Sequence, residues 1–332
     1  LVVNSDVDGL RQLGDQEVDI VHMVSKVTKR AVLLQDPLQV ASTIDSLFST
    51  SVSDRPGPIW LDVPIDVQST ILPDDFESLI NQPLVAEVNR LSPSDADLDL
   101  IASHLLTNDR PVLYVGSGIR TANAYQEFLD FLDKWPIPTV TGWNSNDLLW
   151  DDHASYSGRP GTIGNRTGNF AVQYSSCVLV VGCRLNIRQI SYNWTDFARS
   201  AWTCHVDIDI AELNKPTLST NLKVHADAKG FFPALSISLE KYIRRNKLNM
   251  EHVLSHWNEW RNWLKNNLVE YPVLRDSLPS KSGVVNPYRL IEQLSILLPE
   301  DSVTVCSDGT ACVVGFQSFN FKKGQRLYHN SG

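Results

Sequence analysis

Four turns rich in glycine or other small residues have the composition of phosphate-binding loops. Each follows a segment with the pattern of a strand: Gly116-Ser117-Gly118, Gly158 to Gly164, Gly182 to Arg188 and Asp308 to Ala311. Glycine lets backbone N–H groups approach phosphate oxygens, and the helix that follows adds a favourable dipole. Any α/β protein needs glycine at such turns, but here they occur together with Arg184 and Arg188. The pattern leaves two interpretations open, a dinucleotide or ADP-like ligand and a purely structural role.

Acidic residues at strand ends can likewise have either a ligand-binding or a structural role. Asp207 and Asp209 flank the end of one predicted strand, and Asp227 follows another. A carboxylate at such a position can accept hydrogen bonds from ribose hydroxyls. It can equally cap the N-terminus of the next helix, which here begins at Ala211. Both roles stay open for all three residues.

The turn Ser307-Asp308-Gly309-Thr310 resembles the start of a magnesium–diphosphate motif, in which an Asp and a later Asn hold the ion. Asn330 follows at a shorter separation than that motif has, and Ser307 stands where the motif has glycine. The turn also follows what we expect to be the first strand of its domain. We therefore interpret it as a backbone turn that faces a diphosphate, without a metal.

The residues supply no catalytic apparatus of their own. The sequence contains no Gly-x-Ser-x-Gly, Walker or His-Glu-x-x-His motif. His252 and His256 have the i, i+4 spacing of metal ligands but no third ligand nearby, and we interpret them as solvated helix residues. Cys177 and Cys183 flank an apolar strand and read as buried small hydrophobic residues. We expect no metal held by protein side chains alone, so any demanding chemistry requires a cofactor.

Strands and helices that would position these turns alternate over the middle of the chain. Predicted strands at 112–115, 138–141, 178–181, 205–209 and 224–225 are separated by helical patterns, including one from about Ala122 to Lys134. This alternation is typical of a three-layer α/β domain with a parallel sheet. A helix with three tryptophans, Trp257, Trp260 and Trp263, follows, and we expect it to pack on a domain surface.

Two shorter units flank this domain. A helix near Leu38 to Phe48 leads to the apolar strand 59–63, which we expect to be an inner strand of a parallel sheet, yet only 58 residues precede it. A helix from Pro287 to about Leu298 and the strand 303–306 open another unit near the end. We expect both units to be truncated. The expected divisions are a first unit (1–70), a linker (71–91), the central domain (92–240), a connecting helix and linker (241–286) and a last unit (287–332).

Charge and composition argue against nucleic-acid and membrane partners and favour a reducing compartment. A net charge of −9 argues against nucleic acid, which needs a basic face. No apolar segment approaches a membrane span, and the start of the chain has no signal-peptide pattern. The 5 cysteines have no framework spacing, which fits a reducing compartment, and we expect a cytoplasmic protein.

The order of these segments resembles thiamine-diphosphate-dependent enzymes of the acetolactate synthase type over essentially the whole chain. The matching segments are Gln16 to Asp19, Thr28-Lys29, Gly57 to Gln68, Arg110 to Gly118, 158–164, Gly182 to Asn186, His205 to Glu212 and His225 to Asp227. The resemblance implies three α/β domains: one for the cofactor pyrimidine, a central one and one for the diphosphate. It also implies a homodimer or homotetramer, because the cofactor lies between subunits.

The resemblance assigns roles to particular positions. The candidates for FAD or another nucleotide are Gly116, Ser117, Gly118, Gly161, Gly182, Arg184, Arg188, Asp207 and Asp227. The candidates for thiamine diphosphate are Gly309, Thr310, Ala311, Ser331 and Gly332, and those on the substrate side are Gln16 and Lys29. Asn186 stands where the family usually has Asp, and related enzymes bind ADP in the central domain or leave it empty.

The resemblance also implies what the chain lacks. The glutamate that activates the cofactor would lie upstream of Leu1, and the motif that holds Mg²⁺ would lie downstream of Gly332. We therefore expect no catalytic residue among these positions and an inactive fragment. The complete protein is expected to decarboxylate a 2-oxo acid such as pyruvate and transfer its acyl unit.

Two alternatives remain open. The first keeps the family but changes the reaction to that of a decarboxylase, oxidase or lyase acting on another 2-oxo acid. The second is a non-catalytic nucleotide-binding protein built on the central domain.

Overall fold

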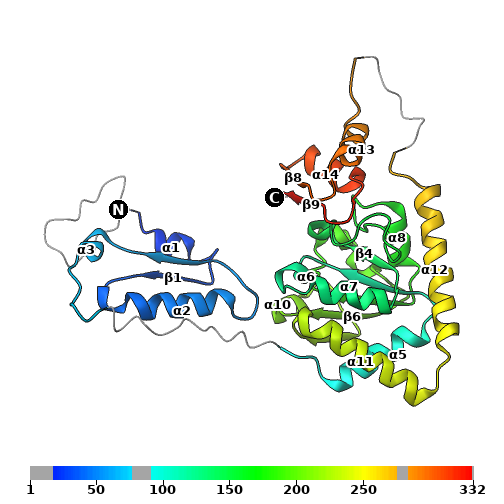
Figure 1. Cartoon of the computed structure of the whole chain (residues 1–332), viewed down its shortest axis with the longest axis horizontal. Coiled ribbons are helices and arrows are strands. Elements are labelled where there is room, and N and C mark those ends of the chain that lie inside the picture. The colour runs from blue at the N-terminus through cyan, green and yellow to red at the C-terminus, as the bar shows by residue number, and fades with distance from the viewer. Residues whose placement is uncertain (1–17, 77–90, 275–282, 331–332) are drawn as a thin grey trace. The chain divides into compact units, whose positions relative to one another are not determined.

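The computed structural model describes residues 18–76, 91–274 and 283–330 (Figure 1). The chain divides into two compact units, with the division between Arg90 and Leu91. Within the described residues, no helix is both long and apolar enough to cross a bilayer.

In its described part, residues 18–76, the first unit contains two parallel strands and three α-helices. Strand β1 (Arg30–Leu33) pairs with β2 (Ile59–Asp62), and the helices are α1 (Ile20–Val24), α2 (Val40–Val52) and α3 (Ile65–Gln68). A short 3₁₀ turn (Pro37–Gln39) precedes α2, so the predicted helix begins slightly later than expected. The expectation of a covered inner strand is not met in residues 18–76. There β2 has β1 as its one neighbour, and Trp60 remains 39% exposed.

The second unit is built on a five-stranded parallel sheet in the order β4-β3-β5-β6-β7. Its strands are β3 (Pro111–Val115), β4 (Thr139–Thr141), β5 (Cys177–Val181), β6 (Trp202–Asp207) and β7 (Leu222–His225). We call residues 91–274 the sheet domain. Strands β3 and β5 are wholly buried and apolar, as expected for strands covered on both faces.

Helices cover both faces of this sheet, which confirms the three-layer α/β class. One apolar core includes Leu113 and residues of α5 (Asp95–Thr107), α7 (Tyr125–Lys134) and α11 (Ala228–Asn246). The other includes Val112 and residues of α8 (Arg166–Gln173) and α12 (Met250–Glu270). Neighbouring positions along a strand point to opposite faces, so Leu113 and Val112 enter different cores. The remaining short helices are α6 (Gly118–Thr121), α9 (Ile187–Ile190) and α10 (Ile210–Leu213), with 3₁₀ turns at Trp143–Ser145 and Trp194–Asp196.

Two helices of the sheet domain can be compared with the helices predicted from the sequence. The predicted helix from Ala122 to Lys134 begins only at Tyr125, because Asn123 adopts a left-handed conformation (φ 52°) that separates α6 from α7. In α12, Trp257 and Trp260 are buried, whereas Trp263 is 42% exposed. The packing role predicted for the tryptophan helix is confirmed.

The C-terminal segment, residues 283–330, belongs to the second unit and is drawn in orange to red in Figure 1. It contains α13 (Pro287–Leu297), β8 (Val303–Cys306), α14 (Thr310–Ser318) and β9 (Arg326–His329), with β8 and β9 parallel. Phe316 from α14 packs with Trp143 of the sheet domain, their ring centroids 4.5 Å apart. This contact brings the turn before α14 into the same unit as the glycine-rich turns.

Candidate functional site

The glycine-rich turns after β3 and β5 meet where the strand order reverses. The chain passes from β3 to β4 on one side and returns to β5 on the other, so β3 and β5 are neighbours with different crossovers. In parallel sheets the crevice outside such a switch point is the usual place for a nucleotide. The structure thus brings Gly116 and Gly118 next to Gly182.

These glycines are required by the contact between the two turns. The Gly118 N–H donates to Gly182 O over 2.9 Å, and a Cβ on Gly116 would lie 2.2 Å from the same oxygen. Gly182 also has a positive φ of 56°. Close packing of the two turns is therefore enough to explain these glycines. Ligand binding would be a second role. Ser117 lies between Gly116 and Gly118, and its carbonyl accepts a hydrogen bond from Thr121 Oγ1 over 3.2 Å.

Gly161 lies against the end of the turn that follows β5. A Cβ on Gly161 would be 2.4 Å from Arg188 O, and its φ is 131°. Its N–H donates to Asn169 Oδ1 over 2.9 Å. Arg188 places its guanidinium 5.2 Å from the centre of the Trp143 ring. Gly161 and Arg188 are thus brought together by backbone packing.

Two neighbouring cavities are lined by these turns. One, of about 320 Å³, is lined by residues that include Gly161, Asn169 and Gln189. The other, of about 350 Å³, is lined by Arg184, Leu185, Asn186, Ile187, Trp194, Ala211, Glu212, Lys215 and Thr217. Ile190 and Ser191 line both. Each has the size of a small ligand site.

The second cavity carries an excess of positive charge. Arg184 Nε lies 2.5 Å from Glu212 Oε1, and Lys215 Nζ lies 3.3 Å from Glu212 Oε2. Lys215 Nζ also donates to Leu185 O over 3.3 Å. Two cations against one carboxylate favour an anionic ligand.

The acidic residues at strand ends are N-caps or turn residues. Asp209 accepts a hydrogen bond from the Ala211 N–H over 2.9 Å at the start of α10, and Asp227 accepts one from the Lys229 N–H over 2.8 Å at the start of α11. Asp207 accepts one from the Asp209 N–H over 2.9 Å. Asp209 and Asp227 thus cap helices and Asp207 stabilises a turn, so a ribose contact would be a further role for each.

His205 is a buried polar residue of this region that the sequence patterns did not single out as functional. Its Nε2 lies 3.0 Å from Cys183 O, and it is 2% exposed. Burial lowers the pKa of His205 to about 4, so the ring is neutral at pH 7. Burial raises the pKa of the Cys183 thiol to about 12, which rules it out as a nucleophile at pH 7. A polar residue inside an apolar strand was the signal that could have drawn attention to His205.

The turn before α14 has the geometry of a backbone turn. Gly309 has a φ of 73° with open space around its Cα, and its N–H donates to Asp308 Oδ1 over 2.5 Å. Gly309, Thr310 and Ala311 are exposed at the N-terminus of this helix of 9 residues. The Gly309 N–H is thus already bonded, whereas the N–H groups of Thr310 and Ala311 belong to the first turn of α14, where they have no partner within the helix and can bind an anion such as a diphosphate.

The remaining predicted residues lie elsewhere. Lys29, in the first unit, donates from Nζ to Ser53 O over 2.7 Å. Gln16, Ser331 and Gly332 lie outside the described residues. In the described parts of the chain, no three His, Cys, Asp or Glu side chains are grouped as metal ligands.

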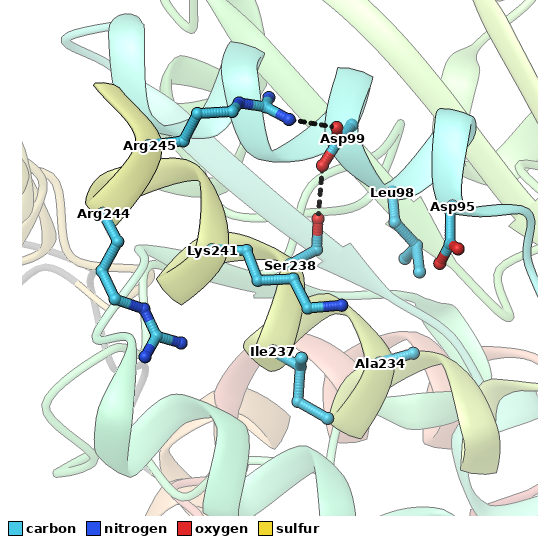
Figure 2. A pocket seen from close by; sticks show the side chains of 9 residues that line it. All are labelled: Asp95, Leu98, Asp99, Ala234, Ile237, Ser238, Lys241, Arg244 and Arg245. Atoms are coloured by element: carbon cyan, nitrogen blue, oxygen red, sulfur yellow. Dashed lines mark hydrogen bonds and ion pairs between the residues drawn. The ribbon is translucent and has the colours of Figure 1, made fainter. Parts of the chain in front are cut away.

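A further hollow of about 630 Å³ lies between α5 and α11, and none of the residues that line it is a predicted site residue (Figure 2). Its lining carries three cations and two carboxylates, and one Arg–Asp ion pair forms among them. Arg245 Nη1 lies 2.8 Å from Asp99 Oδ2, and Ser238 Oγ lies 3.3 Å from Asp99 Oδ1.

Comparison with known proteins gives a consistent result. A family model described as "Thiamine pyrophosphate enzyme, central domain" matches residues 98–235. The acetolactate synthase large subunit of Corynebacterium glutamicum is 27% identical over 317 residues, covering 96% of this chain and 48% of that protein. The chloroplastic acetolactate synthase of Arabidopsis thaliana is 27% identical over 322 residues, covering 96% and 45%. The isozyme 2 large subunit of Escherichia coli is 29% identical over 228 residues, covering 68% and 40%. The chain thus spans about half the length of the curated relatives it matches.

Proposed function

This chain is a relative of the thiamine-diphosphate-dependent enzymes of the acetolactate synthase type, and we propose that the whole protein decarboxylates a 2-oxo acid such as pyruvate and transfers its acyl unit. The observation that carries the proposal is the similarity to acetolactate synthase large subunits along 96% of the chain. Because the chain spans about half of those relatives, the activity is proposed for the whole protein.

Thiamine diphosphate would supply the electron sink for this reaction, and the residues of this chain would bind and orient it. The exposed Gly309–Ala311 turn supports a role in holding the diphosphate, because the first amides of α14 have no partner within the helix and nothing lies within 4 Å of a Cβ on Gly309. In the family the cofactor lies between subunits and is held through Mg²⁺, so we include the metal and a homodimer or homotetramer in the proposal.

We further propose that the sheet domain binds FAD or an ADP-like nucleotide across the two neighbouring cavities. The excess positive charge around Arg184 and Lys215 supports an anionic ligand there. Asn186, where relatives usually have Asp, caps α9 by accepting a hydrogen bond from the Arg188 N–H over 3.0 Å. An Asp could make the same hydrogen bond, so the substitution preserves the shape of this turn.

Purified whole protein tests both parts of the proposal. We expect consumption of pyruvate that depends on added thiamine diphosphate and Mg²⁺, followed by product analysis to distinguish acyl transfer from simple decarboxylation. Flavin absorbance, or an adenine nucleotide released on denaturation, would support the second part. A protein that retains a nucleotide but neither binds thiamine diphosphate nor consumes any 2-oxo acid would contradict the first part and favour the non-catalytic alternative.

A further inference from the structure

We propose that Arg159 is a positioning residue that fixes helix α14 on the sheet domain and thereby sets the orientation of the Gly309–Ala311 turn. The inference rests on the proposed function, in which that turn meets the cofactor diphosphate. Arg159 belongs to the glycine-rich segment 158–164, but its side chain reaches the C-terminal segment instead of the cavities.

The Arg159 guanidinium binds the far end of α14 directly. Its Nη1 donates to Phe316 O over 2.8 Å and to Phe319 O over 3.0 Å. The last carbonyls of a helix have no partner within the helix, and a cation near them also complements the helix dipole. The side chain is only 3% exposed, so these charge-assisted hydrogen bonds are shielded from water.

A partly buried carboxylate completes the contact. Arg159 Nη2 lies 3.2 Å from Asp151 Oδ1 and 3.1 Å from Asp151 Oδ2. Asp151 also accepts a hydrogen bond from the Phe321 N–H, and its own N–H donates to Phe321 O over 3.0 Å. The guanidinium lies 4.9 Å from the centre of the Phe321 ring. Residues 316–321 are therefore held by hydrogen bonds, charge and ring contact at once.

The backbone of Arg159 is held equally firmly. Its carbonyl accepts a hydrogen bond from the Asn165 N–H over 2.9 Å, and its N–H donates to Asn165 Oδ1 over 3.3 Å. Asn165 is the N-cap of α8, which packs on the sheet. The positive end of the ion pair is thus anchored to the sheet domain.

Helix geometry explains how this contact acts at a distance. α14 has 9 residues, so at about 1.5 Å per residue its two ends are about 13 Å apart. Because the helix is short and rigid, a shift of its Phe316 end by a given distance changes the position of Gly309 by a similar distance. Loss of Arg159 need not detach the segment, because Asp147 separately holds β9 through Arg326 Nε at 2.6 Å. We expect misplacement of the turn and not unfolding.

The test uses whole protein carrying Arg159→Met, which keeps an unbranched apolar side chain but removes all of the donors. Arg245→Met is the matched control, because it removes another Arg–Asp ion pair, in the hollow of Figure 2. We measure the dissociation constant and KM for thiamine diphosphate, kcat at saturating cofactor, and backbone hydrogen exchange of residues 313–318.

We expect Arg159→Met to raise the dissociation constant and KM for thiamine diphosphate about tenfold or more, with kcat within about twofold, and to speed hydrogen exchange in α14. Arg159→Lys keeps the charge but not the planar fork, so it should recover only part of the affinity. Arg245→Met should match the wild type in every measurement.

A folded Arg159→Met protein with wild-type cofactor affinity and wild-type exchange in α14 would overturn the inference. If this variant does not fold, Arg159→Lys takes its place. A single ammonium cannot reproduce the bonds of the guanidinium to both carbonyls and to Asp151, so a rise in α14 exchange supports the inference and no change contradicts it. Failure of the proposed function looks different, because wild-type protein would then not bind thiamine diphosphate at all.

Discussion

Acidification should destabilise the sheet domain through His205. Burial lowers the pKa of this side chain from an ordinary 6.5 to about 4. The unfolded chain therefore takes up a proton near pH 6.5, whereas the folded chain takes it up only near pH 4. Stability is full above pH 6.5, falls as the pH drops through this window, and levels off below pH 4. Between pH 7 and pH 4.5 the loss from this one group is about 2.5 kcal/mol.

A variant with a neutral side chain isolates this contribution. Gln in place of His205 cannot titrate, and its amide nitrogen can still donate to Cys183 O, which the imidazole approaches at 3.0 Å. The two proteins share every other titrating group, so effects that do not involve residue 205 cancel in the difference. Asp207, whose Oδ2 lies 3.9 Å from His205 Nε2, is coupled to the ring, and this coupling is part of the measured change. We expect the stability of the wild type relative to His205→Gln to fall by about 2.5 kcal/mol from pH 7 to pH 4.5.

Urea unfolding followed by tryptophan fluorescence at pH 7, 5.5 and 4.5 measures this difference. The result at pH 5.5 should lie between the other two, because only part of the window has been crossed. A difference that stays constant within about 0.5 kcal/mol, comparable to the usual error of such measurements, would refute the argument. A constant difference would mean that water or a partner stabilises the charged imidazole in the folded protein, so that folding does not lower its pKa.

Three further outcomes follow from contacts at the switch point and on the helices. Gly116→Ala should cost about 2 kcal/mol or more, because its Cβ would lie 2.2 Å from Gly182 O. Gly230→Ala, the control inside α11 with nothing within 4 Å, should gain about 0.5–1 kcal/mol, and urea midpoints compare the two. Asp209→Ala should lose about 1 kcal/mol of stability in thermal unfolding, whereas Asp209→Asn should lose less than half of that because Asn still caps α10. Cys183, whose pKa of about 12 leaves about one thiolate in ten thousand at pH 8, should resist iodoacetamide in the native protein and react after denaturation, as read by mass spectrometry.

Much of the sheet domain could be predicted from the sequence because its strands are buried on both faces. Strands such as β5 are short apolar runs bounded by turn residues, and each was recognised near its true position. The break between α6 and α7 was missed because it depends on a left-handed Asn123, which an apolar pattern does not reveal. Strand β2 was recognised, but its exposed Trp60 was not, since exposure depends on what the rest of the fold places over it.

The sequence predicts which turns lie at the carboxyl edge of the sheet, but it does not predict which residues of these turns contact one another. Glycine after a strand marks the carboxyl edge of the sheet, so Gly116 and Gly182 were found without knowing that they touch. Their contact follows from the strand order, which puts β3 beside β5 although β4 lies between them in sequence. Arg159 was overlooked for a related reason. It stands in a glycine-rich loop, and nothing local indicates that its partners are Phe316 and Phe319.

The wall shared by the two cavities has a consequence for their ligand. Because Ile190 and Ser191 line both spaces, a single molecule that filled both would contact these two residues from both cavities. Its halves would meet different chemistry, cations at Arg184 and amides at Asn169 and Gln189. Each half alone would bind weakly, but binding of one raises the effective concentration of the other to roughly the millimolar range. The covalent link within the ligand, more than any single contact, would then supply the affinity.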